Sequence, residues 1–370
     1  MKQKWKYYLT AVLILVIIAG LIRPMIPTPS PSGQVQPDPS QQVQPEESEE
    51  VIKESIPYWT EDSAVMKSIM DFVKQVSDPA SEAYVEKEDR IAVFDFDGTL
   101  YGELFPTYFD TSLMIYRALH DESYEAPAEI KEYAEALEYA FDNGLEEPDS
   151  PLSGAQCQAE MFKDFTIEQY RDYVRSFMKT EVKGFNGMTY EEGFYMPMVS
   201  LVEYLDANDF TVFISSGSER NIVRELIEGV LDEYIPSDRV IGSTFTLKAT
   251  GQGDKAGKSY NYKPEDEIVM EGNLVTKNQK TNKIFSIIDE IGNAPLMVFG
   301  NSSGDLAMGE YALQHGGRGY MLLCDDTERD YGKLETAEKF KTDCEEYGFE
   351  TVSMKDDFKT IYKEGFEKAD

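Results

Sequence analysis

Short apolar runs that each end in polar residues recur along the chain beyond residue 90. Such runs are typical of buried parallel strands, because helices cover both faces of a parallel sheet. Amphipathic helical patterns separate the runs, and this alternation predicts an α/β fold with a Rossmann-like parallel sheet. The expected core strands cover residues 91–96, 211–215, 239–244, 295–300 and 319–324.

Two insertions interrupt this alternation. The long stretch between the first two strands has apolar residues at helical spacing, as in AEIKEYAEALEYAFDNG and TIEQYRDYVRSFMK, and predicts a helical insertion. Between Ser218 and Lys277, the segments VIGSTFTLKATG and EDEIVMEGNLVT read as strands separated by turns. A further amphipathic helix is expected at residues 63–76, ahead of the first strand.

The N-terminal residues read as a targeting segment. MKQKWKYY carries three lysines and is followed by the apolar run Leu9–Ile22. The run is short for a membrane span but long enough for the core of a signal peptide, so residues 1–23 are an anchor or a signal peptide. We expect an uncleaved anchor with its lysines inside, which places the catalytic part outside the cytoplasm on the cell membrane; secretion after cleavage is the alternative. Residues 24–56, rich in Pro, Ser and Gln with an acidic end, are an expected linker.

The charge of the chain narrows its partners. It has 69 Asp and Glu against 35 Lys and Arg, a formal net charge of −34. Such a chain repels nucleic acid and anionic membrane surfaces, and no basic patch is visible. We therefore expect no nucleic-acid partner, and membrane attachment only through the N-terminal segment.

The segment IAVFDFDGTLYGE carries the first candidate chemistry. Its strand-like start brings Asp95 and Asp97 to a Gly98-Thr99 turn. Ligands of parallel sheets bind beyond the carboxyl ends of the strands. At such a place one carboxylate is suited to attack phosphorus, and a second, two residues on, to transfer the proton.

Three later segments supply the other parts of a phosphoryl-transfer site. TVFISSGSER ends in Ser215, Ser216 and Gly217, whose hydroxyl and backbone amides are suited to hold phosphate oxygens next to a helix N-terminus. KNQKTNKIFSII brings Lys280 to the start of an apolar-faced helix. VFGNSSGDLAM is a further strand end with oxygen ligands suited to Mg²⁺, namely Asn301 and Asp305.

In this order, the four segments resemble the four motifs of the haloacid dehalogenase (HAD) superfamily, and in particular its phosphatases related to phosphoserine phosphatase. The resemblance runs from about residue 57 to the C-terminus, and segments outside the motifs, such as YMPMVSLVEYL and CDDTERDYG, resemble a bacterial branch that is often exported. It implies a HAD hydrolase domain at 57–370, with a helical cap at about 104–195 and a small β extension.

The resemblance also implies roles for the site residues. Asp95 is the expected nucleophile and Asp97 the expected general acid/base. The expected substrate-binding residues are Ser215, Ser216, Gly217, Lys280, Thr99 and Glu103. The expected Mg²⁺ ligands are Asp95, the carbonyl of Asp97 and Asn301, with Asp305 in support.

Two departures from the family pattern leave alternatives open. The fourth motif usually opens with an acid, whereas here it opens with Asn301, so metal affinity falls or Asp305 takes over direct ligation. Lys277 and Lys283 compete with Lys280 for the role of the phosphate-binding lysine.

The implied function is Mg²⁺-dependent hydrolysis of a small phosphomonoester through an aspartyl-phosphate intermediate. Asp97 favours hydrolysis of that intermediate, because HAD transport ATPases carry Thr at this place. The alternatives are a HAD-fold surface binding protein with weakened catalysis, or a phosphotransferase. Arg171 and Arg175 lie one helical turn apart in the insertion, where they are either solvated or suited to recognise an anionic substrate tail.

Overall fold

The computed structural model describes residues 55–103 and 106–369. The expected anchor at Leu9–Ile22 and nearly all of the expected linker therefore lie outside the described residues. Residues 53–370 form one compact unit. Within the described ranges, no helix is both long enough and apolar enough to cross a bilayer.

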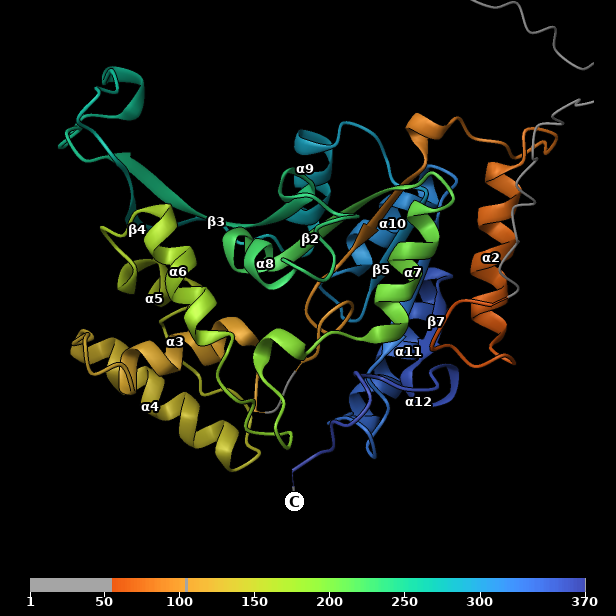
Figure 1. Ribbon diagram of the computed structural model, residues 1–370, viewed down its shortest axis with the longest axis horizontal. Coiled ribbons are helices and arrows are strands. Elements are labelled where there is room, and N and C mark those ends of the chain that lie inside the picture. The colour runs from red at the N-terminus through yellow and green to blue at the C-terminus, as the bar shows by residue number, and fades with distance from the viewer. Residues whose placement is uncertain (1–54, 104–105, 370) are drawn as a thin grey trace, which may run out of the picture. The chain divides into compact units, whose positions relative to one another are not determined.

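A seven-stranded sheet forms the centre of this unit, in the order β4-β3-β2-β1-β5-β6-β7 (Figure 1). Every neighbouring pair is parallel except β3 and β4, which are antiparallel. The strands are β1 Ile91–Phe94, β2 Thr211–Glu219, β3 Val240–Ala249, β4 Ile268–Thr276, β5 Met297–Gly300, β6 Arg318–Leu323 and β7 Glu350–Ser353. The predicted α/β fold with a parallel sheet is confirmed.

The central strand β1 is buried on both faces, as its uninterrupted apolar sequence predicts. Ala92 and Phe94 contribute to the core on one face of the sheet, and Ile91 and Val93 to the core on the other. Phe94 stacks on Phe299 of the neighbouring β5, with ring centroids 4.2 Å apart. Because β1 pairs in parallel with both β2 and β5, the ends of all three strands meet at one edge of the sheet.

Helices cover both faces of the sheet. Residues of α2, α7 and α8 pack on the Phe94 face, and residues of α9, α10 and α11 on the Val93 face. These helices are α2 Ala64–Ser77, α7 Met196–Asp206, α8 Arg220–Leu226, α9 Thr281–Glu290, α10 Leu306–Gln314 and α11 Leu334–Tyr347; the short α12 Met354–Asp357 follows β7. Single 3₁₀ turns lie at Lys87–Asp89, Tyr190–Glu192, Ser237–Arg239 and Gly257–Ser259.

The insertion predicted at about 104–195 is helical; we call it the cap, and its described residues form four α-helices. They are α3 Phe109–Leu119, α4 Ala128–Asp142, α5 Gly154–Met161 and α6 Ile167–Phe177. The cap has a small core of its own, in which Ile130 and Leu137 of α4 pack with Met114 of α3 and Cys157 of α5.

The β3–β4 hairpin joins the cap to the sheet. The Gln156 side chain on α5 donates to the carbonyl of Gly272 (3.1 Å) and accepts from the amide of Leu274 (3.0 Å). The amide of Met270 donates to the carbonyl of Phe165, just before α6 (2.8 Å). The expected β extension is this hairpin, and its far end projects beyond the cap (Figure 1).

Candidate active site

Asp95 directly follows β1 and lies at the base of the site. Its side chain is buried, and its Oδ1 accepts a hydrogen bond from Lys283 Nζ at 2.5 Å. Burial and the nearby Asp305 raise the pKa of Asp95 to about 7, although Lys283 acts in the opposite direction. The strand therefore delivers a carboxylate whose charge depends on this lysine.

Lys283, and not Lys280, is the lysine that contacts Asp95. Its Nζ, on a side chain that is 2% exposed, donates to Asp95 Oδ1 (2.5 Å), to the Ser215 carbonyl (2.6 Å) and to Asp305 Oδ1 (2.7 Å). Burial opposes its charge, but Asp305 and Asp95 outweigh burial and raise the pKa of Lys283. Lys280 is the N-cap of α9 and is exposed, whereas Lys283 lies in the first turn and is buried.

Asp305 has no free carboxylate oxygen. Its Oδ1 accepts from Lys283, and its Oδ2 accepts from the amides of Asn301 and Ser302 (both 3.1 Å) and from Ser302 Oγ (3.2 Å). The residue is 1% exposed. Asp305 therefore holds the loop after β5 and orients Lys283, and its geometry suits the supporting role rather than direct metal ligation.

Asp97 lies in different surroundings from Asp95. Its Oδ2 accepts from Ser218 Oγ (2.7 Å) and Ser216 Oγ (3.5 Å), while its buried Oδ1 has no hydrogen-bond partner. Burial and the neighbouring Asp110 raise the pKa of Asp97 to about 8. Near neutral pH this carboxyl group therefore carries a proton that it can donate.

The segment after β2 is arranged differently from the prediction. Ser215 is buried; its Oγ accepts from Asn278 Nδ2 (3.1 Å), and the residue does not line the cavity described below. Gly217 and Ser218 do line it. The backbone carbonyl of Ser215 is thus placed to position Lys283. The hydroxyl of Ser218 lines the cavity, where the hydroxyl of Ser215 was expected. The sequence carries no signal for Asn278, a buried polar residue in the approach to α9.

A hydrogen-bonded group lies beside Asp95 on the other side of the site. Thr99 Oγ1 donates to Asn301 Oδ1 (3.3 Å), and Asn301 Nδ2 donates to Glu103 Oε1 (2.8 Å), which also accepts from Tyr108 Oη (2.9 Å). Burial raises the pKa of Glu103. Gly98 has a φ of 79°, and a Cβ there would lie 2.0 Å from Asn301 Nδ2, so only glycine fits the turn. Thr99 does not line the cavity and positions Asn301 instead.

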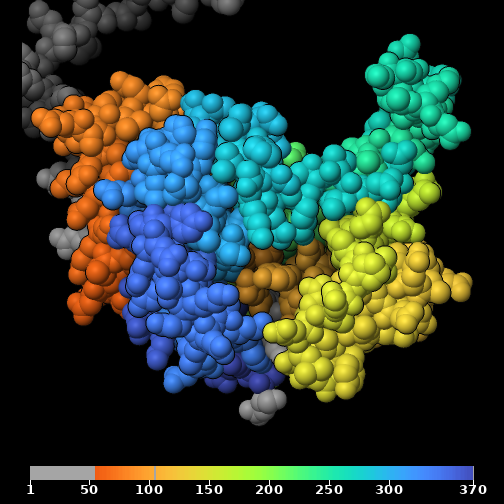
Figure 2. Space-filling model, turned by 180° about the vertical axis from the view of Figure 1, so that it is seen from behind, coloured from red at the N-terminus to blue at the C-terminus, as the bar shows by residue number. Residues whose placement is uncertain are grey.

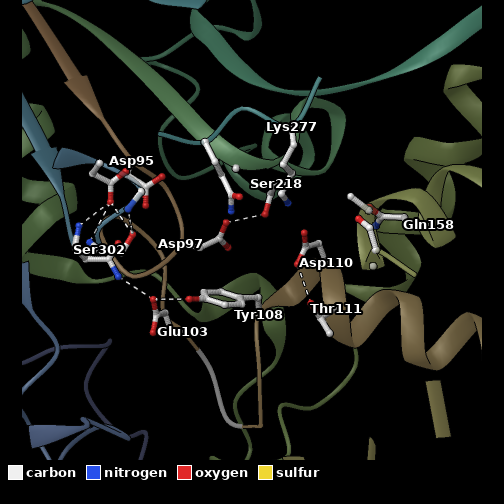
Figure 3. A pocket seen from close by; sticks show the side chains of 18 of the residues that line it. Asp95, Asp97, Glu103, Tyr108, Asp110, Thr111, Gln158, Ser218, Lys277 and Ser302 are labelled. Carbon is white, nitrogen blue, oxygen red and sulfur yellow. Dashed lines mark hydrogen bonds between the residues drawn. The ribbon is translucent and has the colours of Figure 1, made fainter. Parts of the chain in front are cut away.

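These residues surround a cavity of about 430 Å³ between the core and the cap. The core supplies Asp95, Asp97, Glu103, Gly217, Ser218, Lys277, Lys283, Asn301 and Asp305, and the cap supplies Asp110, Thr111, Met114, Glu147 and Gln158, among others. Figure 3 shows side chains from both parts pointing into the same space. Figure 2 shows the surface hollowed between the blue core helices and the yellow cap.

Arg171 and Arg175 of the cap do not reach this cavity. Both donate to the buried Glu225 on α8, Arg175 at 2.6 Å, and so connect α6 to the core. Neither arginine lines the cavity. They are therefore not available to recognise an anionic substrate tail.

The oxygen atoms at the strand ends fit a hard divalent cation. Within the described residues, no group of three or more His, Cys, Asp or Glu is arranged to hold a metal ion. The donor set here is instead mixed. It consists of the Asp95 carboxylate, the Asn301 side-chain amide oxygen and the backbone carbonyl of Asp97, all at the edge of the sheet where β1 and β5 end. Carboxylate, amide and backbone oxygens are ligands that Mg²⁺ accepts while it keeps several waters.

Comparisons with known proteins found no matching family model and no matching curated protein. Similar solved structures include a conserved protein of unknown function from Anaerococcus prevotii (15% identity, 78% of this chain and 91% of that chain, TM-score 0.48). They also include cytosolic 5'-nucleotidase IIIB bound to cytidine (14% identity, 78% and 84%, TM-score 0.44). A phosphoserine phosphohydrolase-like protein from Francisella tularensis is a third (15% identity, 68% and 92%, TM-score 0.34). Because these identities and TM-scores are low, the fold and the chemistry of this chain are inferred from its own sheet and its own site.

Proposed function

We propose that the chain is a HAD-type phosphatase that hydrolyses a small phosphomonoester through an aspartyl-phosphate intermediate and depends on Mg²⁺. The observation that carries this proposal is the contrast between two carboxyl groups two residues apart. Burial raises the pKa of both groups, but the ion pair with Lys283 opposes this rise for Asp95, to about 7, whereas the pKa of Asp97 is raised to about 8 and its buried Oδ1 has no hydrogen-bond partner. Such a difference in surroundings supports the roles of Asp95 as the nucleophile and Asp97 as the acid.

The reaction follows from these positions. A carboxylate oxygen of Asp95 attacks phosphorus, the bond from phosphorus to the ester oxygen breaks, and Asp97 gives its proton to the leaving alcohol. Asp97 then takes a proton from a water molecule, whose oxygen attacks the same phosphorus. The bond between phosphorus and the Asp95 oxygen breaks, so that inorganic phosphate leaves and both carboxyl groups return to their starting states.

The phosphoryl oxygens need positive partners in this acidic site. Lys277 lines the cavity, and Ser218 and Gly217 lie at its edge just before α8. Lys283 favours the ionised form of Asp95 and adds a positive charge at the base of the site. Preorganised donors of this kind stabilise the charge on the equatorial oxygens in the transition state.

Asp95, the carbonyl of Asp97 and Asn301 would hold the Mg²⁺, with Asp305 in support. The ion supplies the positive charge that lets a phosphate dianion approach two carboxyl groups. Asn301 contributes a neutral oxygen where an acid is usual, and Glu103 lies against its amide nitrogen at 2.8 Å. A carboxyl group therefore lies next to position 301, although residue 301 itself is neutral.

Release of p-nitrophenol from p-nitrophenyl phosphate tests the proposal. We expect Mg²⁺-dependent release that EDTA abolishes and added Mg²⁺ restores. Asp95→Asn cannot form the acyl phosphate and should lose essentially all turnover while remaining folded. Asp289→Asn, which changes an exposed aspartate of α9 outside the cavity, is the matched control and should keep full activity. Substantial turnover by Asp95→Asn would contradict the covalent mechanism.

A further inference from the structure

Among the residues that the structure describes, the cap side of the cavity is acidic and contributes no cationic side chain. The cap contributes the carboxylates of Asp110 and Glu147 to the lining, together with polar and apolar side chains. The two lysines of the lining, Lys277 and Lys283, both come from the core, and Lys283 is already paired with Asp95 and Asp305. The part of the cavity that faces away from the phosphate position is thus negative.

Asp110 is the cap acid whose charge acts on Asp97. It lies in the first turn of α3, is half-buried, and accepts a hydrogen bond from Thr111 Oγ1 (3.3 Å). Glu147 accepts one from Tyr133 Oη (2.9 Å). Neither Asp110 nor Glu147 has an ion-pair partner among the described residues; of the cationic side chains of the cap, Arg117, His120, Lys183 and the arginines of α6 pair with other acids. The charges of Asp110 and Glu147 are therefore left for a ligand.

Gln158 supplies an independent indication of a ligand. It projects from α5, is 2% exposed and lines the cavity, yet its Nε2 has no hydrogen-bond partner. In the view of Figure 3, Asp110 and Thr111 lie between Asp97 and Gln158. A buried amide without a partner is costly, and one that faces a cavity is satisfied when a bound molecule presents an acceptor oxygen.

We propose that this cap wall, formed by Asp110, Thr111, Glu147 and Gln158, selects the phosphate ester of an amine-bearing alcohol. The ammonium group lies against Asp110 and Glu147, and a hydroxyl oxygen of the same alcohol accepts from Gln158 Nε2. A second anionic group on the substrate, such as a carboxylate, is repelled by Asp110 and Glu147, and the arginines of α6, which are bound to Glu225, do not line the cavity to receive it. The inference rests on the proposed function and names the substrate class of that site.

The size of the cavity suits alcohols as large as an amino sugar. Its volume of about 430 Å³ lies within the range of sites that enclose small ligands. Electrostatic selection of this kind is strongest where the site is shielded from water and falls with added salt. A preference for the amine should therefore be larger at low ionic strength.

Matched substrate pairs test the proposal with the full chain. The pairs are glucosamine 6-phosphate with glucose 6-phosphate, and phosphoethanolamine with propyl phosphate. In each pair we expect kcat/KM to be roughly tenfold higher for the amine, as expected for one charge pair in a partly shielded site. N-acetylglucosamine 6-phosphate, which lacks the charge, should lose this advantage. Equal or higher kcat/KM for the neutral members, or for phosphoglycolate, would overturn the inference.

Variants assign the preference to the wall. Asp110→Asn should reduce the ratio of amine to neutral substrate, whereas Glu135→Gln, at an exposed acid of α4 outside the cavity, should leave the ratio as in the wild type. Gln158→Met should lower kcat/KM for glucosamine 6-phosphate more than for phosphoethanolamine, which has no hydroxyl. An unchanged ratio in Asp110→Asn would remove the cap wall from specificity.

The two proposals fail in different ways. Turnover of p-nitrophenyl phosphate without an amine preference leaves the phosphatase assignment intact and refutes the substrate class. If none of these esters is hydrolysed, the proposed function fails, and calorimetric binding of the same pairs decides whether the wall selects amines.

Discussion

Asp95 and Asp97 are separated by a single residue, but their neighbours differ in charge. Asp95 contacts a buried lysine, whereas Asp97 contacts two serine hydroxyls and lies near Asp110. An opposite charge favours the ionised form of a carboxyl group, and burial near a like charge favours the protonated form. At the scale of single residues, the site is therefore defined by the partner of each carboxylate.

Replacement of Lys283 tests the most deeply buried of these partners. Lys283→Met leaves Asp95 and Asp305 buried without their cation, so we expect a loss of about 3–5 kcal/mol in the free energy of unfolding. We also expect kcat/KM to fall by at least about 100-fold. Lys280→Met is the matched control, and because Lys280 is exposed its stability should change by less than about 0.5 kcal/mol. Urea unfolding and p-nitrophenyl phosphate turnover measure both effects; equal losses in the two variants would contradict the assignment.

Asn301→Asp tests the proposed metal ligand. The substitution adds a negative charge beside the ion, so the Mg²⁺ concentration for half-maximal activity should fall roughly tenfold. The same charge lies beside Glu103, so in EDTA the variant should unfold at a lower temperature than the wild type. Asp305→Asn should instead lower stability at every Mg²⁺ concentration, because both oxygens of Asp305 are already used. An unchanged Mg²⁺ requirement in Asn301→Asp would remove Asn301 from the ligand set.

Among the elements, α8 joins the substrate-facing segment to the cap. It begins directly after β2, and its Glu225 accepts hydrogen bonds from Arg171 and Arg175 of α6. Its N-cap is Glu219, whose Oε2 accepts from the amides of Asn221 (2.9 Å) and Ile222 (3.2 Å). The position of α8 therefore influences both the Ser218 side of the cavity and the attachment of the cap.

The N-cap of α8 should make stability depend on pH. Burial raises the pKa of Glu219 from about 4.5 to about 7. Between these values the folded state binds a proton that the unfolded state lacks, so the contribution of Glu219 to stability falls as the pH rises from 4.5 to 7. Glu219→Gln keeps an acceptor for the cap without a charge. We expect it to match the wild type at pH 4.5 and to exceed it by up to about 3 kcal/mol at pH 8.

Urea unfolding of the wild type and Glu219→Gln across this pH range measures the difference between their stability curves. Other buried carboxyl groups titrate in both proteins and cancel in the difference. Parallel curves would show that Glu219 has the same pKa in the folded and unfolded states.

At the scale of the whole molecule, every cavity residue belongs to the compact unit at 53–370. We propose that residues 1–23 attach this unit to the outside of the cell membrane. The full chain should then fractionate with membranes and be cleaved by protease added to intact cells. A chain that begins at Glu54 should stay in the soluble fraction with unchanged kcat/KM. Mature protein free in the medium would indicate a cleaved signal peptide, and protection from external protease would refute the extracytoplasmic location.

The sequence by itself determined the central strands and the place of the two aspartates. Strands such as IAVF are recognisable because a strand buried on both faces must be apolar throughout, and this is a local property of the chain. β7 was missed because its sequence ETVS has no apolar run and only Val352 is fully buried. The adjacency of Asp95, Asp97 and the loop after β5 also follows from the sequence, because the ends of neighbouring parallel strands share one edge.

Only the tertiary structure decided which side chain of each later segment enters the site. The choice of Lys283 over Lys280 depends on where α9 begins and on its rotation against the sheet, and a shift of one residue turns a helix by about 100°. The exchange of Ser215 for Ser218 depends on the register irregularity of β2 between Ser215 and Glu219. The pairing of Arg171 and Arg175 with Glu225 joins segments far apart in the chain. Such contacts arise from packing between elements, and packing leaves no local pattern in the sequence.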